Sequence, residues 1–241
     1  MTDRSVSQYS GYLPSFGFFC AKRVRSFLLM KSRLPTSQTC AGARQILDAA
    51  LEVFAAHGYE GASIHAIAQR AGVSKANVFH HFASKEQLYL AVLRSASRSW
   101  SEDLAHVPAI PGGFPAQLQA MIHRTLQHLM RESAQSRVVL REMLENGALR
   151  GRQLSEEIFA DNFEIETEIF RHAQAGGKLR SGVDPVLAWM MTVAVCAFFF
   201  QTRDVMCFNP AYPYANSPDR YAQGICDALL HGIAAPREAS Q

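Results

Sequence analysis

The residues best able to make specific polar contacts in this chain lie between Ser63 and Lys85. The side-chain amide of Asn77 can pair with the edge of a base, and adenine is its usual partner. Lys75 and Lys85 can neutralise phosphates, and the hydroxyls of Ser63 and Ser74 can donate hydrogen bonds to them. These side-chain types indicate contact with nucleic acid, provided that one structural element displays them together.

The pattern of residues 63–82 predicts that element, a helix, a tight turn and a second helix. Ala68 is small where two helices must cross closely, and Gly72 supplies a turn backbone that a side chain would strain. Val73 is apolar and can fill the gap between the helices, and Ser74 can cap the second one. A helix-turn-helix places its second helix in the DNA major groove, so the segment predicts DNA binding.

On the second helix, Val78 and Phe82 lie four residues apart and are expected to anchor it in the core. The long or polar positions are Lys75, Asn77, Phe79, His80 and His81. His80 and His81 either contact DNA or are polar residues on an exposed face. We expect no metal there, because adjacent helical residues point about 100° apart and no cysteine or carboxylate cluster lies near them.

Three blocks cover about fifty residues of this region without a gap. Residues 46–59 form an amphipathic segment with an F-x-x-x-G-Y ending, residues 63–74 lead into the turn, and residues 77–88 end in F-x-S-K-E-x-L. Together they resemble the N-terminal domain of TetR/AcrR-family transcriptional regulators. The length of the match makes the resemblance specific, whereas the spacing of a bare helix-turn-helix would be a weak signal.

The resemblance implies DNA contacts at a defined set of positions. They are Ser63, Ser74, Lys75, Asn77, Phe79, His80, His81 and Lys85. The family commonly has Tyr where this chain has Phe79, so a phenolic contact to the DNA backbone is lost, and the Phe79 ring is available to touch a thymine methyl instead.

Composition and helical periodicity predict an all-α protein without a sheet. We expect an N-terminal extension at 1–40, without order, a three-helix DNA-binding domain at 41–90, a helical ligand-binding and dimerisation domain at 91–234 and a tail at 235–241. Residues 1–100 hold 12 Lys and Arg against 5 Asp and Glu, a net +7, whereas residues 101–241 hold 12 against 16, a net −4. A basic first part agrees with DNA binding at that end of the chain.

Residues 186–200 are almost entirely apolar and flanked by Asp184 and Arg203. A membrane-spanning helix needs about 20 apolar residues, so a buried core helix is expected instead. Its own domain can cover one side and a second subunit the other. With the apolar stripe of the last helix, this predicts a homodimer built by residues 185–207 and 218–233, as the resemblance also implies.

The resemblance makes a pocket for a small-molecule effector of unknown identity the expected feature of the second domain. Candidate lining residues are Met121, Met143, Phe163, Trp189 and Phe198, which equally suit an ordinary helical core. Possible polar partners are His123, His128, Arg141 and Glu145.

The five cysteines form no C-x-x-C pair, which favours a reducing cytoplasm over a disulfide framework. Residues 1–29 lack the layout of a signal peptide. They are either an upstream extension or a basic arm that contacts DNA phosphates.

The chain carries none of the common catalytic motifs and no sign of a cofactor, so an enzyme is not expected. The sequence therefore predicts a dimeric repressor that binds an inverted-repeat operator in double-stranded DNA and is released by a small ligand. The alternative is an activator or an architectural DNA-binding protein without an inducer.

Overall fold

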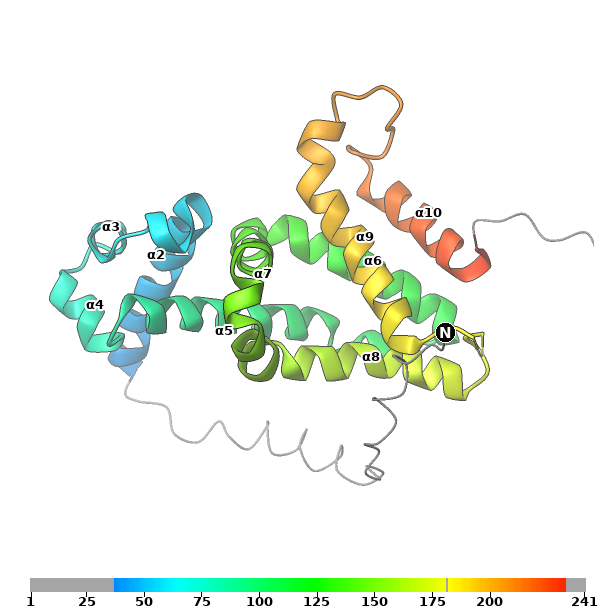
Figure 1. The fold of residues 1–241 in the computed structure, drawn as a ribbon, viewed down its shortest axis with the longest axis horizontal. Coiled ribbons are helices and arrows are strands. Elements are labelled where there is room, and N and C mark those ends of the chain that lie inside the picture. The colour runs from blue at the N-terminus through cyan, green and yellow to red at the C-terminus, as the bar shows by residue number, and fades with distance from the viewer. Residues whose placement is uncertain (1–36, 181, 233–241) are drawn as a thin grey trace, which may run out of the picture. The chain divides into compact units, whose positions relative to one another are not determined.

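The computed structural model describes residues 37–180 and 182–232, and across these two ranges it contains helices and no strand (Figure 1). The helices are α2 (Ser37–Gly61), α3 (Ile64–Arg70), α4 (Lys75–His81), α5 (Lys85–Leu104), α6 (Gly113–Arg131), α7 (Ser133–Gln153), α8 (Ala160–Ala175), α9 (Pro185–Met206) and α10 (Pro218–His231). The all-α fold is confirmed. The predictions for residues 1–36 and for the tail 235–241 lie outside the described residues.

Serine caps and one glycine set the boundaries of the short helices. The side-chain oxygens of Ser63, Ser74 and Ser84 each accept a hydrogen bond, at 3.1 Å, from the backbone N–H three residues later. Gly72 has a φ of 64°, a left-handed conformation that favours glycine, and it reverses the chain between α3 and α4. The predicted helix-turn-helix is therefore present. Helix α2 contains a kink at Gly58, where φ is 70°.

The described residues from 45 onward form one compact unit that contains two apolar cores. The first core holds together residues 46–93, here called the head, which comprise most of α2, all of α3 and α4, and the first half of α5. Val138 of α7 and Leu154 and Ile158 of the π-helical turn Leu154–Ile158 belong to the same core. The head is thus packed directly against α7 and the turn that follows it.

The second core lies among the later helices. Its centre is α6, which packs against α5, α7, α8, α9 and α10 (Figure 1). Phe170 of α8 and Phe199 of α9 are among its largest buried side chains. Cys196 and Cys226 lie in this core as small apolar residues, whereas Cys207 is exposed. Cys20 and the side chain of Cys40 lie outside the described residues.

Helix α9 contains the apolar run of the sequence, but it is longer than that run. It has 22 residues, and its length and composition alone would allow it to cross a membrane. Its buried residues are Ala188, Thr192, Cys196 and Phe199. They form one stripe at spacings of about one helical turn, whereas Leu187, Met190 and Phe198 on other sides are exposed. One side of α9 is therefore covered by its own chain.

Candidate DNA-binding surface and ligand cavity

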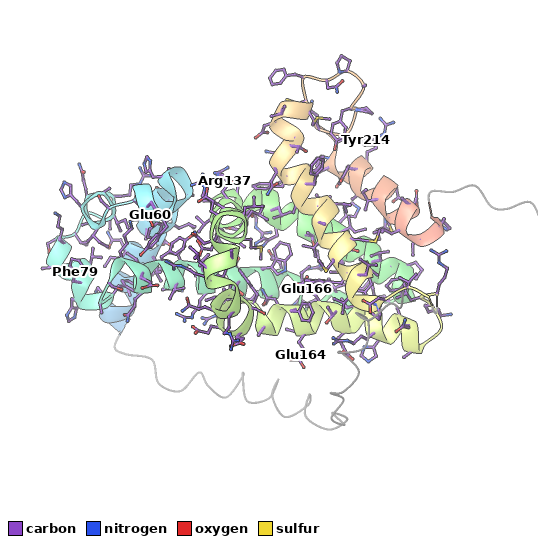
Figure 2. All side chains as sticks on the ribbon, viewed as in Figure 1. Glu60, Phe79, Arg137, Glu164, Glu166 and Tyr214 are labelled. Carbon is purple, nitrogen blue, oxygen red and sulfur yellow. The ribbon has the colours of Figure 1, made fainter. Side chains whose placement is uncertain are left out.

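Helix α4 presents most of the predicted DNA-contacting side chains to the outside. The exposed ones are Lys75, Asn77, Phe79 and His80. Figure 2 shows Phe79 on the outer side of α4. Val78 is fully buried and Phe82 packs half-buried against the first core, which fixes the rotation of the helix about its axis. The polar side chains of α4 therefore face outward, where they can contact another molecule.

Three other predicted contact residues border this surface. The ring of His81 is half-buried and packs edge-on against that of His80, with 5.2 Å between centroids. Ser63 and Ser74 are exposed, and each oxygen accepts a capping bond. A hydroxyl that accepts such a bond still has its own hydrogen to donate. Both serines are therefore able to donate to a phosphate while they cap their helices.

Lys85 is held where α2 ends and α5 begins. Its Nζ donates a hydrogen bond to the carbonyl oxygen of Glu60, labelled in Figure 2, at 3.4 Å. The same nitrogen lies 4.5 Å from the centre of the Tyr59 ring. These contacts fix the ammonium in the first turn of α5, where unpaired backbone N–H groups and the helix dipole also favour an anion.

A buried carboxylate connects α7 to the head. Glu142 is 1% exposed and accepts hydrogen bonds from the hydroxyl of Tyr89 at 2.9 Å and from the amide nitrogen of Asn146 at 2.7 Å. The Nε of Arg150 lies 3.8 Å from the other oxygen of Glu142, an ion pair without a hydrogen bond. The guanidinium of Arg150 also lies 3.6 Å from Glu86. Glu142 therefore has a cation and two donors around it.

Arg150 also contacts the head, near Lys85. The guanidinium carbon of Arg150 lies 5.0 Å from the Tyr59 ring, which is the ring that Lys85 contacts. Burial, followed by the hydrogen bond to Glu142, raises the pKa of Tyr89 well above its usual value, so the phenol remains a donor. We call Tyr59, Tyr89, Glu142 and Arg150 the α7 clasp.

A cavity of about 400 Å³ lies among α5, α6, α7, α8 and α9. Its apolar wall includes Leu129, Val139, Leu140, Leu154, Phe159 and Val193. The volume falls within the range of pockets that hold small organic ligands. Helix α7 lines this cavity with Val139, Met143 and Gly147, and it contacts the head with Val138 and Glu142.

A second buried carboxylate, that of Glu166, lies in the cavity wall and is 4% exposed. One of its oxygens accepts a hydrogen bond from the indole nitrogen of Trp100 at 2.6 Å, and the other accepts one from Trp189 at 2.7 Å. Burial raises the pKa of Glu166, although both indole hydrogen bonds favour the ionised form. Among the described residues that line the cavity there is no Lys or Arg.

Most other polar groups of the wall are already paired. Asn162 donates to the backbone oxygen of Ser97 at 3.1 Å and to its hydroxyl at 3.0 Å. The Nδ1 of His128 lies 2.5 Å from a carboxylate oxygen of Asp103. The exception is Gln135, whose side-chain oxygen is buried without a hydrogen-bond partner, while its nitrogen donates to the carboxylate of Glu132 at 3.4 Å.

The structure brings three of the five predicted ligand residues together. Met143, Phe163 and Trp189 line the cavity. Met121 is instead fully buried in the second core, and Phe198 lies 61% exposed on α9, outside the cavity. Of the polar candidates, His128 lines the cavity, and His123, Arg141 and Glu145 do not.

Sequence reasoning missed Glu166 and Trp100. The sequence does contain a signal for Glu166, because Phe159, Phe163, Glu166 and Phe170 follow one another at spacings of four, three and four residues. Side chains at this spacing share one face of a helix, so a carboxylate stands within an apolar stripe. A charge in that position indicates either a buried partner or a ligand site.

The comparisons with known proteins agree with this arrangement. The model of the bacterial regulatory proteins of the tetR family matches residues 46–92. The HTH-type transcriptional regulator RutR of Escherichia coli K12 is 43% identical over 74 residues, which is 28% of this chain and 35% of RutR. The chain thus matches about a third of that relative's length. RutR is a transcriptional regulator, which agrees with the prediction of a regulator from the sequence.

Two solved structures share the fold over most of the chain. The transcriptional regulator FadR from Bacillus subtilis, in complex with stearoyl-CoA, has a TM-score of 0.66 at 21% identity and covers 79% of this chain and 99% of its own. AibR, in complex with isovaleryl coenzyme A and operator DNA, has a TM-score of 0.62 at 23% identity and covers 78% of this chain and 98% of its own. With its capped helix-turn-helix and the model match over residues 46–92, the head resembles the N-terminal domain of the bacterial regulatory proteins of the tetR family.

Proposed function

We propose that this protein is a repressor that binds an inverted-repeat DNA operator as a homodimer and leaves it when a small molecule occupies the cavity. The observation that carries the proposal is α4, a helix anchored by buried Val78 whose exposed side chains include Lys75 and Asn77. The net +7 of residues 1–100 supports the same role, because phosphate contacts supply much of the affinity for DNA.

The DNA-binding proposal is tested by two exchanges on α4, measured on an operator selected from random DNA. Asn77→Ala is expected to cost about 1–3 kcal/mol and to relax the preference at one base pair, since the amide reads a base edge. Lys75→Ala is expected to weaken binding to all sequences and to reduce the salt dependence by about one phosphate contact. Lys178→Ala, an exposed lysine after α8, is the control.

The result that would contradict this assignment is simple. If Asn77→Ala selected the same operator as the parent with the same affinity, α4 would not be the reading helix. If Lys178→Ala changed the salt dependence as much as Lys75→Ala, the basic residues of the head would have no special role.

The homodimer is supported by the uncovered side of α9. Met190, Met191 and Phe198 are about half exposed there, and the amphipathic α10 packs beside α6. Two copies of α9 and α10 would form a four-helix interface under two-fold symmetry, as the sequence predicts. The symmetry would place two α4 helices in successive major grooves of an inverted repeat.

Phe198→Asp tests this interface, because the exchange places a charge on the exposed side of α9 without touching the second core. We expect the dimer dissociation constant to rise by roughly two orders of magnitude or more, since an unpaired charge would be desolvated. Leu149→Asp, at a highly exposed leucine of α7, is the control. Analytical ultracentrifugation that finds both variants equally dimeric, or the parent monomeric at micromolar concentration, would refute the interface.

The effector role of the cavity is supported by its size and by its place beside α7. A molecule pressing on Val139, Met143 or Gly147 would act on the helix that holds the head through Val138 and the α7 clasp. Solved structures of the same fold contain stearoyl-CoA or isovaleryl coenzyme A, which agrees with an apolar cavity for part of a ligand. Release requires the effector to bind the DNA-free arrangement more tightly than the DNA-bound one.

A further inference from the structure

The cavity wall contains two buried hydrogen-bond acceptors with capacity to spare. The side-chain oxygen of Gln135 has no partner, and its assignment is fixed because its nitrogen faces the carboxylate of Glu132, which can only accept. The carboxylate of Glu166 accepts two bonds, although a carboxylate offers about four lone-pair positions. A ligand that complements this wall must therefore donate hydrogen bonds.

The surroundings of Glu166 also favour a positive charge. Each of its oxygens accepts an N–H from a neutral indole, an arrangement that stabilises the anion without neutralising it. No Lys or Arg is found among the described residues that line the cavity, and His128 is already paired with Asp103. A buried carboxylate without a counter-charge is costly, so a cation that enters the cavity gains the missing ion pair.

The aromatic side chains next to Glu166 strengthen this preference. Trp100 and Trp189 line the cavity beside the carboxylate they bind, and the ring of Phe163 packs edge-on against that of Trp189, with 5.0 Å between centroids. Aromatic faces attract cations, most strongly those of tryptophan. The rest of the wall is mostly apolar and its described residues include no other carboxylate, so only one end of the ligand is expected to be charged.

We propose that the cavity selects a largely apolar amine, bound as its ammonium ion with the charged nitrogen at Glu166 and the hydrocarbon part among the apolar side chains of α7 and α9. This inference rests on the proposed effector role of the cavity. Burial raises the pKa of Glu166, and an ammonium ion beside the carboxylate would lower that pKa again.

Both tryptophans of the chain line the cavity, so tryptophan fluorescence of the full-length protein reports directly on its occupancy. We would titrate the protein at pH 7 with three probes of equal length: decylamine, 1-decanol and decanoate. The ammonium form of decylamine is expected to bind at least about tenfold more tightly than 1-decanol, and decanoate more weakly than either.

Glu166→Gln is the decisive variant, and Glu164→Gln is its control. Figure 2 shows both residues on α8, with Glu166 among the helices, where it is buried, and Glu164 on the outside, where it is exposed. We expect Glu166→Gln to lose the preference for decylamine over 1-decanol while it still binds 1-decanol, and Glu164→Gln to keep the parent's preference. Should Glu166→Gln fail to fold, Gln135→Leu is expected to weaken decylamine by roughly threefold or more, because it removes an acceptor from the cavity wall.

The results that would overturn the inference are distinct from those that would overturn the proposed function. Tighter binding of decanoate or stearoyl-CoA than of decylamine, no saturable binding of decylamine, or an unchanged preference in Glu166→Gln would each refute amine selection. Operator release by stearoyl-CoA alone would support an effector-responsive repressor and refute the proposal that the effector is an amine. Tight decylamine binding without any effect on the operator complex would support amine selection and contradict the effector role of the cavity.

Discussion

Two buried glutamates differ in what surrounds them, and the difference separates the two regions of this protein. Glu142, at the boundary between α7 and the head, has a phenol, an amide and the guanidinium of Arg150 around it. Glu166, in the cavity, has two neutral indoles. Both carboxylates are almost fully buried, at 1% and 4% exposure, so burial alone does not distinguish them.

The chain provides a counter-charge beside Glu142, which joins α7 to the head, and, among the described residues, none beside Glu166, which lines the proposed ligand cavity. Glu142 gives the head a defined attachment through Tyr89, because a shift of α7 would separate the carboxylate from that phenol, whereas Asn146 and Arg150 lie on α7 and move with Glu142. An unpaired charge in the cavity makes the empty state costly and thereby rewards binding. The stability of variants at the two positions tests this difference.

The largest effect is expected from Arg150→Met, which would leave Glu142 buried without its cation. We expect the free energy of unfolding to fall by about 3 kcal/mol, measured by urea denaturation, since removing one partner of a buried pair leaves an uncompensated charge. Arg152→Met, at an exposed arginine two residues later, is the control and should change stability by less than about 0.5 kcal/mol. Equal small effects in both variants would show that Arg150 does not stabilise the α7 clasp.

The next largest effect on the free energy of unfolding is expected from a double-mutant cycle that combines Glu142→Gln with Arg150→Met. Glu142→Gln alone is expected to cost about 1–3 kcal/mol, because the ion pair is lost and the amide must find new partners. In the Arg150→Met background the same exchange removes an unpaired charge, so its cost should shrink or change sign. Additive effects of the two exchanges would mean that the 3.8 Å approach of Arg150 to Glu142 contributes no coupling.

A smaller effect, seen only with changing pH, is expected at Glu166. Because its pKa is raised in the folded state, the energetic cost of its charge is absent below the unfolded-state pKa and fully present above the folded-state pKa. The stability of the parent relative to Glu166→Gln should therefore fall as pH rises above about 4.3, by at most about 1.4 kcal/mol per pH unit. Thermal unfolding at a series of pH values measures this. If the stability of the parent and that of Glu166→Gln changed with pH in the same way, Glu166 would not be a destabilising buried charge.

The smallest change in stability is expected from Gly147→Leu, on the cavity side of α7. A Cβ added at Gly147 meets nothing within 4 Å, and a leucine inside a helix stabilises it by about 0.5–1 kcal/mol relative to glycine. The new side chain would occupy space in the cavity, so decylamine should bind at least about tenfold more weakly. Ala148→Leu, at the exposed neighbouring position, is the control. If decylamine bound Gly147→Leu as tightly as the parent, its binding site would not be the cavity beside Gly147.

The head was more predictable from the sequence than the cavity, for physical reasons. Its features are local: Ser63 and Ser74 cap helices three residues away, Gly72 makes a turn, and Val78 sits at a fixed helical position. Such patterns are carried by short stretches of sequence.

The cavity depends on side chains that meet from distant helices, and sequence periodicity does not encode such meetings. Trp100 and Trp189 reach Glu166 from positions 66 and 23 residues away along the chain. Met121 was predicted to line a pocket because its type fits one, yet α6 turns it into the second core. The Glu166 position within an apolar stripe was visible in the sequence, but its indole partners were not.

The proposed switch is tested most directly by measuring whether the cavity and the DNA-binding surface affect each other. Tryptophan fluorescence would give the dissociation constant of decylamine, or of whichever probe binds the cavity most tightly, with and without saturating operator DNA. Reciprocal linkage predicts that operator DNA weakens the probe by the same factor by which the probe weakens operator binding, on the order of 5–150-fold for typical coupled sites. An identical probe affinity with and without the operator would contradict control of DNA binding from the cavity.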